Sequence, residues 1–194
     1  MLSHLKNYNI ILASQSPRRQ ELLQGLNIPF EVKVIDMEES YPRELVGVDI
    51  PMYLAEKKAN AYLETMDQNT LLITADTIVW HEGRVFNKPT DKTDAIAMLK
   101  SLSGKTHQVI TGVCISTISK RKTFHVISEV RFASLTSPEI EYYLKNYQPY
   151  DKAGAYGVQE WIGYIGVEYI EGSYFNVMGL PIQRLYTELK RWKV

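Results

Sequence analysis

The sequence contains a single cysteine, Cys114, and no excess of either charge, with 22 Lys and Arg against 22 Asp and Glu. One cysteine excludes a disulfide within the chain, which favours a reducing compartment. A formal net charge of zero argues against binding nucleic acid or an anionic membrane through bulk charge. No run approaches the roughly 20 apolar residues needed to cross a bilayer, and MLSHLKNYN lacks the apolar core of a signal peptide. We therefore expect a cytoplasmic protein without a membrane or nucleic-acid partner.

Several familiar motifs of cofactor binding and catalysis are also missing. The patterns GxxxxGK[ST], GxGxxG and GxSxG do not occur, which excludes the P-loop, the dinucleotide fingerprint and the nucleophile elbow. The four histidines are isolated and lack the spacing of zinc ligands. Cys114 lies in an apolar β-type run and is interpreted as a core residue. A site in this chain must therefore be built from other residues.

The distribution of apolar residues predicts strands and helices that mix without strict alternation. Apolar or alternating runs predict strands at 8–13, 30–35, 70–75, 109–119, 123–134 and 162–170, and a hairpin at 81–86. Helical spacing and capping residues predict helices at about 17–26, 51–66, 90–102 and 137–146 and after Pro181. With no linker or repeat, we expect one domain over 1–194, of the α/β or α+β class, with a mixed sheet and two lobes around a cleft.

The segment LASQSPRRQELL, residues 12–23, predicts a strand, a tight turn and a helix N-terminus. Pro17 suits the first helical turn and Ser16 suits the N-cap. Free backbone N–H groups favour an anion there, and guanidinium groups match phosphate oxygens. A solvated first turn is the alternative, although cations at a helix N-terminus are disfavoured without an anion. The sequence thus predicts a polyphosphate-binding corner formed by Ser14, Ser16, Arg18 and Arg19.

Carboxylates follow two of the expected strands. Asp76 follows the apolar run Thr70–Ala75, and Asp36, Glu38 and Glu39 follow the strand at 30–35. Open α/β sheets place ligands at the carboxyl ends of their strands, and carboxylate oxygens suit a hard divalent ion. An aspartate in this place is equally typical of a turn, so the sequence leaves both interpretations open.

Two lysines and a glycine-rich segment are further candidates for binding. Lys58 lies on an expected helix with an apolar stripe, and Lys88 precedes a proline in a turn. Either can neutralise a polyphosphate, or be an ordinary surface lysine. The segment DKAGAYGVQ (151–159) can approach a base or sugar closely, with Gln159 contacting the base edge. An ordinary buried loop is the alternative.

Five sequence blocks together resemble the Maf family of nucleoside triphosphate pyrophosphatases, in family order along almost the whole chain. They are SxSPRRxELL at Ser14–Leu23, ADT at Ala75–Thr77, KP at Lys88–Pro89, LSGKTHQVITGV at Leu102–Val113 and DKAGAYGVQ at Asp151–Gln159. The resemblance implies a fold similar to that of inosine triphosphate pyrophosphatases: a long twisted mixed sheet flanked by helices, with two lobes around a central cleft. It also implies hydrolysis between the α- and β-phosphates with a divalent cation, Mg²⁺ or Mn²⁺, and often a homodimer.

The resemblance also assigns roles to residues of this sequence. The implied catalytic set consists of a proton acceptor that activates water, its acidic partner and two phosphate-contacting lysines: Asp76, Glu39, Lys58 and Lys88. Glu39 and Asp76 are the implied metal ligands. The implied phosphate loop contains Ser14, Ser16, Arg18 and Arg19. The positions that set base preference in the branch acting on dTTP and UTP correspond to Arg18, Thr77 and Gln159.

Two residues depart from the family pattern: Gln15 replaces a small residue, and Glu160 stands where glycine is common. Both can reshape the edge of the nucleotide pocket. The resemblance implies a dTTP/UTP pyrophosphatase of nucleotide-pool housekeeping. The alternatives are a pyrophosphatase for 7-methyl-GTP or another modified nucleotide, and a nucleotide-binding regulator of cell division without turnover. Zero net charge argues against RNA binding by the basic turn at 119–122.

Overall fold

The protein, described here by a computed structural model over residues 2–193, contains a mixed sheet. Its strands are β1 (Asn9–Leu12), β2 (Glu31–Val32), β3 (Thr70–His81), β4 (Arg84–Phe86), β5 (Thr106–Ser116), β6 (Arg121–Phe132) and β7 (Val167–Glu171). The strand order is β2-β1-β3-β5-β6-β7, and β4 pairs with β3. β1 is parallel to β2 and β3, whereas β4 and β7 pair antiparallel with β3 and β6. This confirms the expected mixed sheet.

Helices occur between most of these strands. The α-helices are α1 (Pro17–Gln24), α2 (Asp49–Asn60), α3 (Lys92–Leu102), α4 (Ser137–Tyr147), α5 (Trp161–Gly166), α6 (Tyr174–Val177) and α7 (Ile182–Arg191). Short 3₁₀ turns are η1 (Ser3–Leu5), η2 (Leu63–Thr65) and η3 (Ala153–Ala155). Within residues 2–193, no helix has both the length and the apolar character that crossing a membrane requires.

The chain folds as two compact units, each built from segments that are not consecutive in the sequence. The first unit is formed by the chain up to Asp76, by Thr111–Val126 and by the chain from Gly179 onward. The second unit is formed by Thr77–Ile110 and Ile127–Met178. The strands β3, β5 and β6 pass from one unit into the other. Two units agree with the expectation of two lobes, and the expected cleft stays a prediction.

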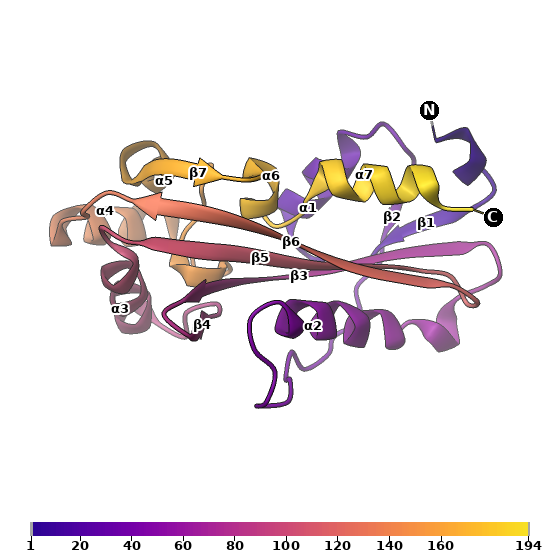
Figure 1. Ribbon diagram of the computed structural model, residues 1–194, viewed down its shortest axis with the longest axis horizontal. Coiled ribbons are helices and arrows are strands. Elements are labelled where there is room, and N and C mark those ends of the chain that lie inside the picture. The colour runs from indigo at the N-terminus through magenta and orange to yellow at the C-terminus, as the bar shows by residue number, and fades with distance from the viewer. Residues whose placement is uncertain (1, 194) are drawn as a thin grey trace. The chain divides into compact units, whose positions relative to one another are not determined.

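In the first unit, helices cover both faces of the sheet (Figure 1): α2 lies on one face, and α1 and α7 lie on the other. Strand alternation decides which side chains meet α2. Leu72 packs in a buried cluster with Ala55 and Ala59 of α2. Two residues further along β3, the Thr74 hydroxyl donates to the Ala55 carbonyl at 2.6 Å. The next residue on this face is Asp76, so the alternation of β3 turns its carboxylate toward α2.

A glycine allows α2 to approach the sheet closely. A Cβ atom at Gly112 on β5 would lie only 2.3 Å from the carbonyl oxygen of Pro51 in the first turn of α2. Real Cβ atoms do not make such contacts, so the start of α2 requires glycine at this position of the sheet. The helix therefore lies against the strand backbone, close to the carboxylate of Asp76.

The second unit has its own apolar core. Residues from β3, β5, β6, α3, α4, η3, the segment after η3, and α5 form one cluster, in which Phe132, Tyr143 and Tyr156 are the large aromatic members. The ring of His107 contacts Phe132 and Tyr156 edge-to-face, with centroids 5.1 and 5.4 Å apart. His107 Nε2 and the Tyr156 hydroxyl share a hydrogen bond of 2.7 Å. This histidine is therefore a core residue with one polar partner.

Local sequence signals predicted several element boundaries well. Ser16 caps α1 with Pro17 in the first turn, and Asp91 caps α3. The expected hairpin at 81–86 is confirmed, because β3 pairs with β4 across a turn in which Glu82 and Gly83 have positive φ angles of 49° and 76°. Positive φ angles at both central residues, with glycine at the second, are typical of a two-residue hairpin turn.

Three predictions about strands were wrong. The strand expected at 30–35 is limited to the two exposed residues of β2. The strand expected at 70–75 continues as β3 to His81, because the β-favouring residues after Asp76 stay extended and pair with β4. Asp76 thus lies within β3, although beyond the end of β1, whose last partner on β3 is Ile73. The first half of the strand expected at 162–170 is the helix α5, whose buried residues Ile162 and Gly166 lie one helical turn apart.

We predict that His107 makes the protein less stable in acid. Burial, with a smaller contribution from His81, lowers the pKa of His107 from 6.5 to about 3. The unfolded chain therefore binds a proton between pH 6.5 and 3 that the folded chain does not, so stability falls as the pH decreases through this range. The loss attributable to His107 is on the order of 4 kcal/mol. Urea unfolding between pH 7 and pH 3.5 measures it.

The variant His107→Gln keeps a polar partner for Tyr156 but cannot titrate, so its stability should depend less on pH than that of the wild type. The control is His125→Gln, which changes an exposed histidine of β6. Equal pH dependence in the wild type and His107→Gln would contradict the prediction.

Candidate active site

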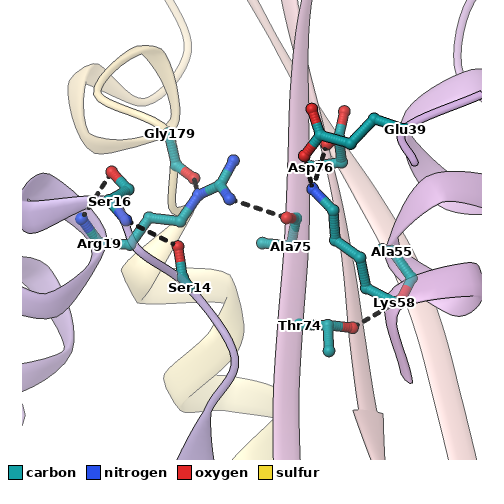
Figure 2. A network of polar contacts seen from close by, with 10 residues as sticks. All are labelled: Ser14, Ser16, Arg19, Glu39, Ala55, Lys58, Thr74, Ala75, Asp76 and Gly179. Atoms are coloured by element: carbon teal, nitrogen blue, oxygen red, sulfur yellow. Dashed lines mark hydrogen bonds and ion pairs between the residues drawn. The ribbon is translucent and has the colours of Figure 1, made fainter. Parts of the chain in front are cut away.

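The strand–turn–helix corner expected at residues 12–23 is present in the first unit. Ser14 is buried, and its Oγ accepts a hydrogen bond from the Ser16 backbone N–H at 3.2 Å. The Ser16 Oγ accepts from the Arg19 backbone N–H at 3.5 Å, as an N-cap does. The Gln20 side chain donates to the Ser14 carbonyl at 3.1 Å. These contacts fix the turn that presents the N-terminus of α1, and Figure 2 shows those among Ser14, Ser16 and Arg19.

Arg19 holds three segments of the first unit together. Its Nε donates to the carbonyl of Gly179 at 2.8 Å, and its Nη1 donates to the carbonyl of Ala75 at 2.7 Å. Burial lowers the pKa of Arg19 and the neighbouring Arg18 adds to this, whereas Asp76 opposes the shift. Arginine stays protonated in proteins, so the guanidinium is a fixed cation. It is bonded to the carbonyl of Ala75, the residue that directly precedes Asp76 on β3. Its expected contact with phosphate stays a prediction.

The structure brings Asp76, Glu39 and Lys58 together, as Figure 2 shows. The Lys58 ammonium lies 2.7 Å from Asp76 Oδ1 and 2.6 Å from Glu39 Oε1. The side chains of Lys58 and Asp76 are only 13% and 10% exposed, whereas that of Glu39 is 42% exposed. One cation therefore joins a buried carboxylate of β3 to an accessible carboxylate of a loop. We call these three residues the carboxylate–lysine cluster.

The loop that carries the acidic residues is attached to α2 through Lys57, and to Tyr62 in the turn that follows α2, by contacts that the sequence did not reveal. The Tyr62 hydroxyl donates to the Lys33 carbonyl at 2.8 Å and accepts from the Ile35 N–H at 2.9 Å. The Lys57 ammonium donates to the Ser40 carbonyl at 2.8 Å and to its Oγ at 2.9 Å. The only sequence feature that pointed to these contacts was the pair Lys57 and Lys58. Their side chains bind two adjacent residues of the loop, Ser40 and Glu39.

The carboxylates of the cluster suit a Mg²⁺ or Mn²⁺ ion that is bound together with substrate. They do not form a site in which protein ligands alone surround the metal ion. Among the described residues there is no group of three or more His, Cys, Asp or Glu side chains that could hold a metal. The two carboxylates of the cluster are hard oxygen donors. Magnesium is commonly bound by one or two carboxylates together with substrate phosphates and water. The residues present therefore fit a cation that arrives with a polyphosphate.

The remaining candidates lie on several elements. Arg18 is half-buried in the first turn of α1, in the first unit. In the second unit, Thr77 is half-buried in β3, Lys88 is exposed between β4 and α3, and Gln159 is half-buried before α5. The Oε1 atom of Gln159 is buried and has no hydrogen-bond partner within residues 2–193. An acceptor in this state favours a ligand that can donate a hydrogen bond.

The fold and the cluster define the class of this protein. It is an α/β protein with the carboxylate–lysine cluster at a central strand and with two arginines in the first turn of α1. More specifically, the chain belongs to the family of Maf-like proteins, whose pattern matches residues 9–192. The family expected from the five sequence blocks is thereby confirmed.

Relatives match over nearly the full chain. A dTTP/UTP pyrophosphatase of Bacteroides fragilis is 59% identical over 192 residues, which cover 98% of this chain and 100% of the relative. A dTTP/UTP pyrophosphatase of Parabacteroides distasonis is also 59% identical, over 99% of this chain and 100% of the relative. Among solved structures, the Ham1 protein of Staphylococcus aureus matches with a TM-score of 0.49 and 14% identity, over 93% of this chain and 99% of that chain.

We predict that Arg19→Lys destabilises the protein by about 1–3 kcal/mol, because a lysine cannot reproduce the fork that bonds two carbonyls. Urea unfolding measures the loss. The matched control is Gln24→Lys, which introduces a lysine at an exposed position of the same helix. A stability equal to that of the wild type would show that the two hydrogen bonds of Arg19 do not hold the corner together.

Proposed function

We propose that the protein hydrolyses dTTP and UTP to the nucleoside monophosphate and pyrophosphate. The observation that carries the proposal is the lysine ammonium shared by Asp76 and Glu39, at 2.7 and 2.6 Å. Full-length relatives that are 59% identical and named dTTP/UTP pyrophosphatase support the substrate. Housekeeping of the nucleotide pool is the corresponding cellular role.

In the proposed reaction, Asp76 accepts a proton from a water molecule as the water oxygen attacks the α-phosphorus. The bond from that phosphorus to the bridging oxygen breaks, and the electron pair leaves with pyrophosphate. The Lys58 ammonium, 2.7 Å from Oδ1, holds the carboxylate of Asp76 in place. General base catalysis of this kind contributes about 10²–10⁴-fold to the rate. Positioning and charge stabilisation contribute the rest.

The other candidates neutralise and orient the triphosphate in this proposal. The N-terminus of α1 offers backbone N–H groups, and Arg18 adds a guanidinium beside them. Lys88 contributes a further cation to the phosphates. Thr77 and Gln159, together with Arg18, contact the base. The buried acceptor of Gln159 supports this role, because thymine and uracil both offer a ring N–H.

We further propose that Mg²⁺ or Mn²⁺ takes part, held by Glu39 and Asp76. A divalent cation supplies charge neutralisation and lowers the pKa of a bound water. The support is the pair of hard oxygen donors joined by one ammonium.

We also propose a cytoplasmic location, because the single cysteine is a free, buried thiol and nucleoside triphosphates are cytoplasmic substrates. A homodimer stays a prediction, for which light scattering of the purified protein is the direct measurement.

We predict that Asp76→Asn lowers kcat for dTTP and UTP at least 100-fold, with a much smaller change in KM, because the amide keeps a contact with Lys58 but cannot accept the proton. Pyrophosphate release in the presence of Mg²⁺ measures both constants. The control is Glu64→Gln, an exposed carboxylate of η2. Undiminished turnover in Asp76→Asn would remove Asp76 from the role of base. A wild type that binds triphosphates but releases no pyrophosphate would refute the proposed activity.

We predict that Glu39→Gln raises the Mg²⁺ concentration needed for half-maximal rate by about tenfold, because one charged metal ligand is replaced by a neutral amide. Titration of the dTTPase rate with MgCl₂ measures the change, with Glu44→Gln in the same loop as the control. An unchanged Mg²⁺ requirement in Glu39→Gln would show that Glu39 is not a metal ligand.

A further inference from the structure

Glu160, which directly follows Gln159, departs from the family pattern. It lies in the second unit, where its carboxylate contacts two partners. Its Oε1 lies 3.0 Å from the ammonium of Lys152, whose side chain is only 9% exposed. Its Oε2 accepts a short hydrogen bond from the hydroxyl of Tyr143 on α4. Lys152 also pairs with the exposed Asp151 at 2.7 Å. The carboxylate is therefore fixed at both oxygens, although it lies in a connecting segment.

The Tyr143 hydroxyl connects this carboxylate to the backbone of the glycine-rich segment. It accepts a hydrogen bond from the Gly157 N–H at 3.0 Å and donates to Glu160. Burial and the bond to Glu160 raise the pKa of Tyr143, so the hydroxyl stays a donor. The Glu160 N–H in turn donates to the Gly157 carbonyl at 3.0 Å. The turn from Gly157 to Glu160 is thus closed by backbone and side-chain bonds together.

The side chains of Gln159 and Glu160 lie side by side over Gly157. A Cβ atom at Gly157 would be 2.9 Å from Gln159 Nε2 and 2.8 Å from Glu160 Cδ. The three heavy atoms nearest to that point are Glu160 Cδ, Gln159 Nε2 and Glu160 Oε2, so the Nε2 end of the amide, rather than Oε1, shares this space with the Glu160 carboxylate. A negative charge attracts the NH₂ end of an amide and repels its oxygen. The Oε1 end of Gln159, which has no partner among the described residues, remains the acceptor.

The orientation of this amide distinguishes two kinds of pyrimidine. Thymine and uracil carry a proton on N3 and can donate to Oε1. Cytosine has an unprotonated N3, which is an acceptor and would require the NH₂ end at that position; its donor is the exocyclic amine on C4, so it cannot donate to Oε1 from N3. A site with a fixed acceptor rejects a ligand that lacks the matching donor, because a buried polar group is then left unpaired.

We propose that Lys152, Glu160 and Tyr143 form a positioning network that fixes the amide of Gln159 with its oxygen toward the base, and thereby favours thymine and uracil over cytosine. The proposal rests on the proposed function, because it takes Gln159 to be the residue that contacts the base. It assigns Glu160 a function that glycine at this position cannot perform. A charge on Glu160, fixed by Lys152 and Tyr143, is the feature that the network requires.

The alternative is that the network only stabilises the fold. Replacing one partner of a buried pair is destabilising in either case, so stability alone does not separate the two. Base selectivity does, because a purely structural network would leave the preference for thymine over cytosine unchanged in every variant that folds.

The test compares the wild type with Glu160→Gln, Glu160→Asp and Tyr143→Phe. The readouts are kcat/KM for dTTP and dCTP, the dissociation constants of dTMP and dCMP by calorimetry, and the melting temperature. We expect Glu160→Gln and Tyr143→Phe to lower the preference for dTTP over dCTP about tenfold, mainly through KM for dTTP. Glu160→Asp retains the charge and should recover part of the preference. Tyr142→Phe, on the exposed side of the same helix, is the matched control.

An unchanged thymine-to-cytosine ratio in folded Glu160→Gln and Tyr143→Phe would overturn the proposal, whatever their melting temperatures. Failure of both variants to fold would assign the network to stability and would also overturn it. The binding constants separate this proposal from the activity: a wild type that releases no pyrophosphate but prefers dTMP to dCMP refutes the proposed function alone. A wild type without preference between dTMP and dCMP refutes the positioning network.

Discussion

The ammonium of Lys58 between two carboxylates is the interaction on which the site depends. The position of Lys58 follows from the packing of α2 against β3 and β5. The small side chains of Ala55 and Ala59 bring α2 against β3, and the glycine of β5 admits the first turn of the helix. Lys58 then follows Ala55 on the face that meets the strand, where the alternation of β3 presents Asp76. A helix one side chain further from the sheet would leave both charges in solvent, where such a pair contributes little.

The sequence predicted local features more reliably than the extent of elements. Helix starts at Ser16 and Asp91 and the turn at Glu82 follow from residues that act on their immediate neighbours. The continuation of β3 past Asp76 was missed because a polar residue in an apolar run is also typical of a strand end. The helix α5 was missed because a run of six residues is too short for its periodicity to separate helix from strand.

For the site, the sequence supplied the groups but not the contacts between them. The blocks that resemble the family predicted Asp76, Glu39 and Lys58, and the structure brings these three together. The roles of Arg19 as a link between backbone carbonyls and of Tyr62 as an anchor of the loop could not be predicted. Such bonds join residues far apart in the chain, and they depend on the packing of α1 and α2 rather than on any spacing.

The charges of the cluster also bear on the need for a metal. Lys58 neutralises one of the two carboxylates, so the cluster keeps a net negative charge. A nucleoside triphosphate brings several further negative charges, and like charges at contact distance repel strongly away from bulk water. If phosphate binds as proposed, the helix N-terminus and Arg18 would offset part of this repulsion. A divalent cation, for which Glu39 and Asp76 are the proposed ligands, would supply positive charge against this repulsion. Under the proposed function, the exposed carboxylate of Glu39 would be unfavourable for phosphates alone and favourable for phosphates that bind together with a metal ion.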